Sequence, residues 1–175
     1  ASEIVAHLTD VHGLKLCTTN TIRAQFINSQ GMTDCVWSEM LYSCHGQNFI
    51  LHFEHRAKDQ MYAAVLRHIT PKLSNTLDFV YTLRVKHGCR SLLWTSHPKP
   101  ISESPHDVID SSDCLLMKDN IALCFSQRSS LGSEGPKALN LIMTGEIQLS
   151  KRARRSGSRS NSSNSSNSSS SNSSS

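Results

Sequence analysis

The sequence predicts an all-β domain built as an antiparallel sandwich, and three observations predict it. Between residues 14 and 144 the apolar residues come in short bursts rather than in long periodic runs. Turn-forming residues separate these bursts, as in Asn28–Gly31 and Gly132–Pro136. In the clearest burst, Phe79–Val85, apolar and polar residues alternate, which is typical of a strand with one buried face.

The predicted elements follow one another along the chain. The expected strands are Ile22–Ile27, Val36–Leu41, Asn48–Phe53, Tyr62–Leu66, Phe79–Val85, Ser91–Thr95, Cys114–Met117 and Leu139–Met143. Gly88 permits the positive φ of a hairpin loop between the strands at Phe79 and Ser91. Pro105 near the start of Ser102–Ile109 predicts a short helical turn. The apolar burst at Asn120–Phe125 fits either a strand or a short helix.

The C-terminal tail, residues 150–175, differs in composition from the rest of the chain. The basic cluster Lys151–Arg155 is followed by Ser and Asn with one Gly and one Arg. No apolar side chains offset the entropy of ordering the tail, so it is predicted to be disordered. The tail contains five of the 18 Lys and Arg residues and none of the 14 acidic residues, so the net charge of +4 arises there. We therefore expect no general nucleic-acid-binding surface on the folded part.

The cysteine pattern favours a reducing compartment. The chain has six cysteines and no Cys-x-x-Cys pair, signal peptide or long apolar span. Disulfides and membrane association are therefore not expected, and a secreted disulfide framework is the alternative. Cys35, Cys44, Cys114 and Cys124 lie in or beside apolar runs, where a free Cys behaves as a small buried hydrophobe. The expected location is cytoplasmic, with nuclear import through Lys151–Arg155 as a further possibility.

The stretch Tyr42–Glu54 contains Ser-Cys-His-Gly-Gln-Asn-Phe and then a strand that ends in Glu. It resembles the opening of the substrate-binding domain of the seven-in-absentia (Sina/Siah) ubiquitin ligases. Five further stretches resemble this family in the same order and at similar spacing: Met61–Val65, Phe79–Leu83, Leu93–Ile101, Ser112–Leu116 and Ser130–Gly132. The resemblance implies a TRAF-like, eight-stranded antiparallel β-sandwich with one or two short helices, one of them at Asn120–Phe125.

The resemblance also implies a peptide-binding groove. In the family, an extended degron peptide lies along a sheet edge by strand addition, beside a Trp that precedes Ser-Cys and an Asn of the last strand. Trp37 and Asn140 match these positions. Because one extra residue separates Trp37 from Ser43, Trp37 belongs to the core unless a bulge absorbs the change, and Met40 is then a second candidate for the groove. Asn140 is expected either to bind the peptide backbone or to face solvent.

The N-terminal residues 1–13 resemble the end of a Siah-type zinc finger. His7 and His12 match its last two ligands, whereas a closed zinc site needs four. Zinc is therefore expected only if the full-length protein supplies two cysteines upstream. The chain begins with Ala rather than Met, which suggests a fragment of a longer protein. The alternative interpretation is two surface histidines on a short helix.

Residues 14–149 then form the TRAF-like domain, for which the resemblance leaves two functions open. The first is substrate or adaptor recognition for an E3 ubiquitin ligase, as a homodimer that directs degron-bearing proteins to proteasomal degradation. The second is a divergent interaction protein without a RING, which binds partners or competes with full-length ligases. The Cys spacing of a RING, which would bind the ubiquitin-conjugating enzyme, does not occur in this sequence, so enzyme activity of the whole protein stays open. A Ser, His and Asp site of its own is not favoured, because no nucleophile-elbow motif is present.

Overall fold

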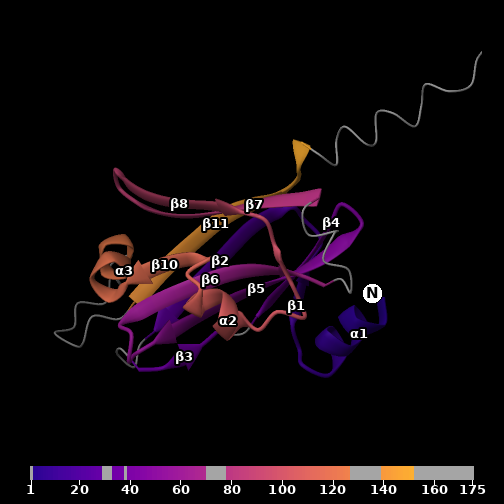
Figure 1. Ribbon diagram of the computed structural model, residues 1–175, viewed down its shortest axis with the longest axis horizontal. Coiled ribbons are helices and arrows are strands. Elements are labelled where there is room, and N and C mark those ends of the chain that lie inside the picture. The colour runs from indigo at the N-terminus through magenta and orange to yellow at the C-terminus, as the bar shows by residue number, and fades with distance from the viewer. Residues whose placement is uncertain (1, 29–32, 38, 70–77, 127–138, 152–175) are drawn as a thin grey trace, which may run out of the picture.

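The computed structural model describes residues 2–28, 33–37, 39–69, 78–126 and 139–151. Two β-sheets lie face to face, with short helices around them, as Figure 1 shows. The all-β sandwich predicted from the sequence is therefore confirmed. The predicted disordered tail from residue 152 onward and the stretch Ser130–Gly132 lie outside the described residues.

The larger sheet has the strand order β1-β4-β5-β6-β10, with β3 beside β5 and β9 beside β6. Its seven strands in the described residues are β1 (Lys15–Cys17), β3 (Cys35–Val36), β4 (Met40–Cys44), β5 (Gln47–Arg56), β6 (Met61–His68), β9 (Lys99–Pro100) and β10 (Leu115–Lys118). The β1–β4 and β6–β9 pairs are parallel, whereas the other pairs in this sheet are antiparallel.

The smaller sheet has the order β2-β11-β7-β8, and all of its pairs are antiparallel. Its strands are β2 (Thr21–Asn28), β7 (Phe79–His87), β8 (Arg90–Ser96) and β11 (Leu139–Leu149). Every predicted strand therefore has a counterpart in one of the two sheets. The predicted strand Val36–Leu41 is divided between β3 and β4. The short strands β1 and β9 were not predicted, because two or three residues are too few to show an alternating pattern.

Three helices occur in the described residues: α1 (Ser2–Asp10), α2 (Pro105–Asp110) and α3 (Asp119–Phe125). The Ser104 hydroxyl accepts a hydrogen bond from the backbone N–H of His106, and Pro105 begins the helix, which explains why α2 starts there. The short helix expected at Asn120–Phe125 is confirmed as α3. None of the helices in the described part of the chain has the length and apolar composition needed to cross a membrane.

The core fills the space between the inner faces of the two sheets. Burial alternates along β2, where Ile22, Ala24 and Phe26 are buried and their neighbours are exposed. From the larger sheet, Phe49 and Phe53 pack into the same layer, and Phe26 stacks on Phe53 at a ring separation of 4.0 Å. This alternation is what the sequence pattern predicted for a sandwich.

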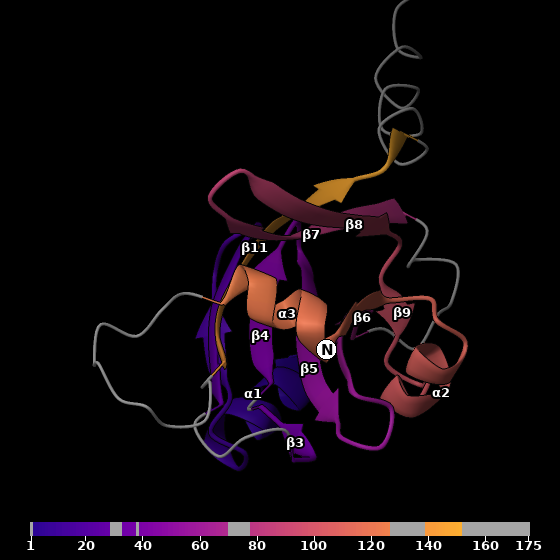
Figure 2. The same ribbon diagram turned by 90° about the vertical axis from the view of Figure 1, so that its left-hand side faces the viewer.

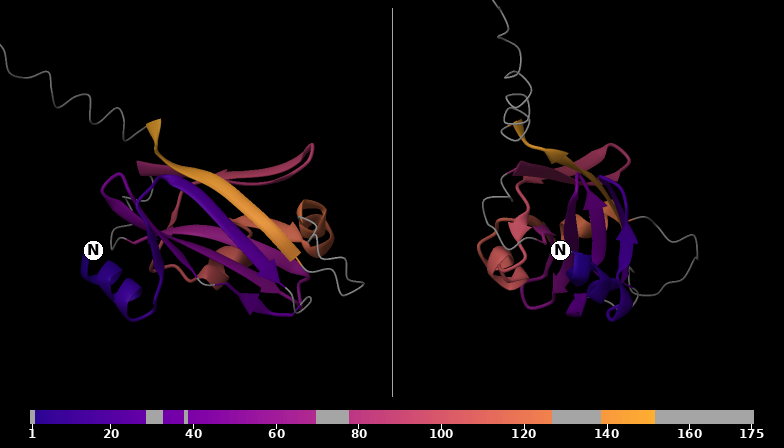
Figure 3. Two further views of the ribbon diagram at one scale, coloured as in Figure 1. Left: turned by 180° about the vertical axis from the view of Figure 1, so that it is seen from behind. Right: turned by 90° about the vertical axis from the view of Figure 1, so that its right-hand side faces the viewer.

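The outer face of the larger sheet is partly covered by α1 and α2, which lie beside this sheet in Figures 2 and 3. Leu41 and Ile50 pack with Leu8 of α1. Near α2, Val65 packs with Val108. The covering explains why β5 is buried on both faces although its outer face carries His52 and Glu54.

The six cysteines are all free, but they are not all buried. Cys114 is buried, while Cys35 and Cys44 are half-buried. The expectation of burial was wrong for Cys124, which is exposed. The reason is that α3 turns Ala122 and Phe125 toward the core, so the residue between them on the helix surface faces outward.

Candidate functional site

The strand formed by β3 and β4 is one residue longer than the part of β5 that it faces. Val36 lies opposite Glu54 and Met40 lies opposite Leu51, so three residues stand against two between these pairs. This arrangement is a β-bulge. The extra residue noted in the sequence is thus accommodated locally, and the pairing beyond it continues in order.

The bulge decides which side chains face the core. In a regular strand, Trp37 and Met40 would point to opposite faces because they are three residues apart. Here both pack against the core layer between the sheets. Glu39 instead lies on the outer face, where its carboxylate meets His52. The bulge thereby places both groove candidates on the inner side.

Trp37 links the two sheets. Its ring lies 4.8 Å from that of Phe53 and 5.9 Å from that of Phe26. Its backbone N–H donates to the carbonyl of Phe53 at 3.1 Å, and its indole N–H donates to the carbonyl of Ile27 in β2 at 3.1 Å. Trp37 is therefore a half-buried core residue and also a residue at the edge of the sandwich, so the two alternatives stated for it are compatible.

The strand β2 has an open side next to Trp37. In the described part of the chain β2 pairs with β11 alone, as the views in Figure 3 show. The Ile27 carbonyl that bonds to the indole points away from β11. Because backbone direction alternates along a strand, Arg23 and Gln25 present their N–H and C=O groups to the same side. A hydrogen bond between the Tyr42 side chain and the Arg23 backbone agrees with this orientation.

Asn140 lies on β11 directly opposite Ile27. Its side chain is half-buried on the outer face of the smaller sheet, and its carbonyl oxygen accepts a hydrogen bond from the Gln25 amide at 2.9 Å. Its backbone N–H donates to the Ser126 hydroxyl at 2.9 Å. Asn140 thus has partners within the protein, and it reaches the open side of β2 only through Gln25. The sequence pattern did not single out Gln25, since only cross-strand register brings the two amides together.

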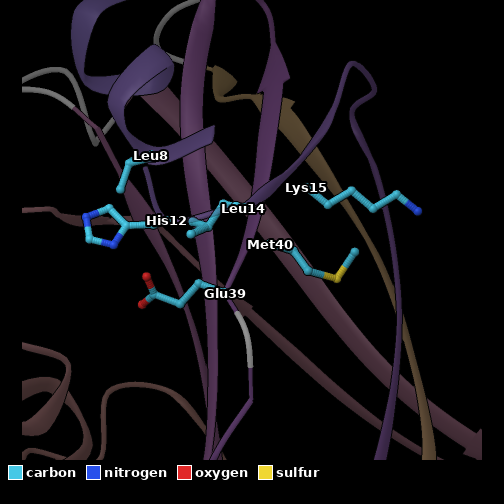
Figure 4. Close-up of a pocket in the computed structure, with 7 residues that line it drawn as sticks. Leu8, His12, Leu14, Lys15, Glu39 and Met40 are labelled. Carbon is cyan, nitrogen blue, oxygen red and sulfur yellow. The ribbon is translucent and has the colours of Figure 1, made fainter. Parts of the chain in front are cut away.

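A hollow of about 510 Å³ lies between α1, β1 and β4. It is lined by Leu8, His12, Gly13, Leu14, Lys15, Glu39 and Met40. In Figure 4 the His12 ring and the Glu39 carboxylate lie on one side of this group, whereas the Lys15 and Met40 side chains extend to the other side. Trp37 does not line this hollow, so the hollow is separate from the Trp37 side of the bulge.

His7 and His12 come together at the end of α1. Their rings are 5.0 Å apart and nearly perpendicular. Two imidazoles at this separation suit two ligands of one tetrahedral zinc ion, but a closed site needs four. Within the described residues no group of three or more His, Cys, Asp or Glu side chains could hold a metal. The residues present therefore fit half of a zinc site, and zinc binding stays a prediction that depends on further ligands.

A chain of charged side chains crosses the outer face of β5. His52 lies between Glu39 at 3.0 Å and Glu54 at 2.8 Å. Glu54 also accepts a hydrogen bond from Arg56, which in turn pairs with Asp110 of α2. Sequence reasoning assigned no role to this group, because its members alternate with core residues along β5.

The pKa values in this group reflect the hydrogen bonds. The hydrogen bond from His52 lowers the pKa of Glu54 to about 2, although burial opposes the shift. Burial lowers the pKa of His52, but the hydrogen bonds to Glu39 and Glu54 outweigh it and raise the pKa above its ordinary value. Both shifts favour the charged forms, so this group is a set of buried ion pairs.

Comparison with known families gives one match, described as "Sina, TRAF-like domain", over residues 42–134, which is more than half of the chain. The chain belongs to the Sina family. One relative of this Sina domain is E3 ubiquitin-protein ligase SINAT4 of Arabidopsis thaliana, 31% identical over 158 residues that cover 88% of this chain and 46% of the relative. Another is E3 ubiquitin-protein ligase sina of Drosophila melanogaster, 33% identical over 109 residues that cover 61% of this chain and 33% of the relative.

The name of a third relative of the Sina domain describes it as a "Probable inactive" ligase. It is the Arabidopsis thaliana protein "Probable inactive E3 ubiquitin-protein ligase SINAT6", 26% identical over 148 residues that cover 82% of this chain and 67% of the relative. The chain spans less than half the length of SINAT4 and of sina. The TRAF-like fold expected from the sequence is thus confirmed by family membership.

Proposed function

We propose that this Sina domain recognises substrates or adaptors for an E3 ubiquitin ligase and binds them as extended peptides along the open side of β2. The observation that carries the proposal is that β2, in the described part of the chain, is an edge strand beside Trp37, the residue that the sequence singled out for peptide binding. The names of the relatives support the ligase context. Recognition of this kind would direct the bound protein to ubiquitin-dependent degradation.

The geometry favours strand addition to β2. Gln25 offers backbone groups to a new strand, whereas the Trp37 indole occupies the carbonyl of Ile27 and the Tyr42 side chain is bonded to the Arg23 backbone, so both limit pairing at those positions. Alternate side chains of the peptide would face the inner layer near Trp37 and the outer face near Gln25. Apolar residues such as Val suit the inner positions, and Pro suits positions whose N–H makes no ladder bond. The family that this chain resembles binds degron peptides with a Val-Pro-type ending, and this resemblance leads us to propose an extended peptide that contains Val and Pro.

A second candidate function is a Sina-type interaction protein without ligase activity. The name of the SINAT6 relative, of which this chain covers 67%, favours keeping this candidate. The two functions are distinguished by the coding sequence upstream of Ala1. A RING and two zinc-finger cysteines there would favour the ligase, and the cysteines would also complete a zinc site with His7 and His12.

Replacing Asn140 with alanine is expected to weaken peptide binding about threefold to tenfold, since loss of one hydrogen bond frees the Gln25 side chain beside the open edge. Fluorescence anisotropy with a fluorescein-labelled peptide that contains a Val-Pro pair measures the affinity. Because Asn140 is half-buried on the outer face, the melting temperature should hardly change. Asn120→Ala on the exposed side of α3 makes the same chemical change elsewhere and serves as the control. Equal affinity of the Asn140 variant and the wild type would remove Asn140 from the groove.

The proposal includes a homodimer and a cytoplasmic location, with nuclear import through Lys151–Arg155 as a separate element. These parts rest on the family resemblance and on the basic composition of the tail. Sedimentation of the chain is expected to give twice the monomer mass. Removal of residues 151–175 is expected to reduce nuclear signal of a fluorescent fusion, and an unchanged distribution would exclude an import role for the tail.

A further inference from the structure

We infer that Glu39 and His52 form a clamp that holds the β-bulge between Val36 and Met40 and thereby positions Trp37. The clamp itself is a feature of the fold. Its effect on peptide affinity rests on the proposed function, because Trp37 matters for binding only if the open side of β2 is the groove. Glu39 and His52 would then be positioning residues, acting on the peptide through Trp37.

The bulge needs an anchor because the pairing that precedes it is short. Within the described residues, β3 pairs with β5 through Cys35 and Val36 alone, and the two residues before β3 add hydrogen bonds from His55 to the Thr33 carbonyl and from the Ala57 N–H to Asp34. A bulge interrupts the ladder of backbone hydrogen bonds and leaves the strand locally less constrained. Glu39 is the last residue of the bulge before β4, and its side chain reaches a partner on the outer face of β5. A side-chain contact at this point can therefore replace the constraint that the ladder lacks.

The contact is an ion pair on a fixed support. One Glu39 oxygen lies 3.0 Å from Nδ1 of His52, and a Glu54 oxygen lies 2.8 Å from Nε2. A ring with a carboxylate at each nitrogen satisfies both only when both nitrogens carry a proton, so His52 is an imidazolium here. His52 is 6% exposed, so its side of the pair is shielded from water, whereas Glu39 is partly exposed. The imidazolium is held on one side by Glu54 and holds Glu39 on the other.

Further charged side chains hold His52 and Glu54 in place. Arg56 bonds to Glu54 and also to Asp110 and His106 of α2, so the outer end of the group is tied to a helix. On the inner end, Arg67 of β6 lies 3.9 Å from Glu39. The clamp is therefore connected to two elements besides β5. Its movable part is Glu39, whose side chain is 29% exposed.

Trp37 is held from the opposite face of the same stretch. Its N–H donates to the carbonyl of Phe53, the residue between His52 and Glu54 in the sequence. The Trp37 ring also lies 4.8 Å from the Phe53 ring on the inner face, so Glu39 and Trp37 contact one short segment of β5 from its two faces. If Glu39 is released, the strand can return toward regular pairing, in which residues three apart face opposite sides, so that either Trp37 or Met40 would turn to the outer face. Loss of the contact between Glu39 and His52 should therefore first change the surroundings of the Trp37 side chain.

The test uses the full chain labelled with 5-fluorotryptophan, which gives one fluorine resonance for Trp37 and one for Trp94. The variant Trp94→Phe assigns the two resonances. In Glu39→Gln and His52→Gln, the Trp37 resonance is expected to shift or broaden while that of Trp94 stays in place. Affinity for the labelled Val-Pro peptide is expected to fall roughly tenfold in both variants. The matched control is His87→Gln, at the exposed end of β7, which should change neither signal.

A double variant and a pH titration test whether the two residues act as one unit. Glu39→Gln with His52→Gln should be no worse than either single variant, because both remove the same contact. The groups that face His52 are Glu39 and Glu54, with Arg67, Arg56, His106 and Asp110 behind them. A raised pKa keeps the clamp intact below about pH 6.5 and releases it as the pH rises through that pKa. The wild-type Trp37 resonance should move over that range, and that of His52→Gln should not.

The possible results test the clamp and the proposed peptide groove independently of each other. An unchanged Trp37 resonance in Glu39→Gln would overturn the clamp. A Trp37 shift in a protein whose wild type binds no Val-Pro peptide would support the clamp and count against the proposed function. Because Glu39 is partly exposed, its variant is expected to fold. If His52→Gln does not fold, the Glu39 variant decides the question by itself.

Discussion

Replacing Gly145 with alanine is expected to lower the free energy of unfolding by about 3 kcal/mol or more. A Cβ atom at this position would lie 1.9 Å from the carbonyl oxygen of Thr82 and 3.0 Å from its carbonyl carbon. Neither atom belongs to a flexible side chain, so the backbone itself would have to move. Gly145 sits in β11 between Ile22 of β2 and Leu83 of β7, where strand pairing on both sides opposes such a movement.

Urea unfolding followed by circular dichroism measures this effect. Gly88→Ala is the matched control, because a Cβ at Gly88 meets nothing within 4 Å and the cost there is only the strain of its positive φ. That strain is about 1–2 kcal/mol. An equal or smaller loss at Gly145 than at Gly88 would show that β11 can move away from β7, contrary to the tight pairing described.

Replacing Glu54 with glutamine is expected to lower the free energy of unfolding by about 3 kcal/mol at pH 7, because it removes one partner from a buried set of ion pairs. The Glu54 side chain is 3% exposed and lies between His52 and Arg56. Without the carboxylate, His52 and Arg56 both lose a buried opposite charge. Glutamine has nearly the same shape, so the loss reports on charge rather than on packing.

The pH dependence of the Glu54 effect has a defined sign. The pKa of Glu54 is lowered to about 2, so its contribution is fully present above the ordinary Glu value of about 4.3 and is lost as the pH falls toward 2. The stability difference between wild type and Glu54→Gln should therefore be largest near neutral pH and shrink below about pH 4. Chemical denaturation at several pH values measures it, with Glu3→Gln on the exposed face of α1 as the control. A difference that stays constant down to pH 2 would contradict the ion-pair account.

The positions of the strands were predictable because they depend on local pattern. Alternation along Phe79–Val85 and the turn residues between bursts are properties of neighbouring positions, and they predicted β7 and its hairpin partner β8. The short helix α2 was likewise signalled by Pro105 near its start. The family was predictable for a similar reason. Short motifs keep their order along the chain even where single residues differ, and this order matched the Sina family.

The arrangement of the candidate site was not predictable in the same way. The sequence showed one extra residue before Ser43 but not how the strand accommodates it, because a bulge and a flipped strand have the same local sequence. The pairing of Asn140 with Gln25 joins β11 to β2, and no local pattern indicates which amides face each other across strands. For Trp37 the sequence left core and groove as alternatives; the structure packs its ring against the core beside the edge strand β2, and its role in a groove stays a prediction.

By itself, then, the sequence determined that this protein is an all-β sandwich of the Sina type and where most of its longer strands lie, although β11 extends six residues beyond the predicted end at Met143. The tertiary structure decided which way Trp37 and Met40 point, that β2 is an edge strand of the smaller sheet in the described part of the chain, and that Glu39 and Glu54 meet at His52. The physical reason is the separation along the chain of the residues on which each feature depends. Strand propensity and burial depend on neighbours along the chain, whereas register, bulges and buried ion pairs depend on contacts between segments that only folding brings together.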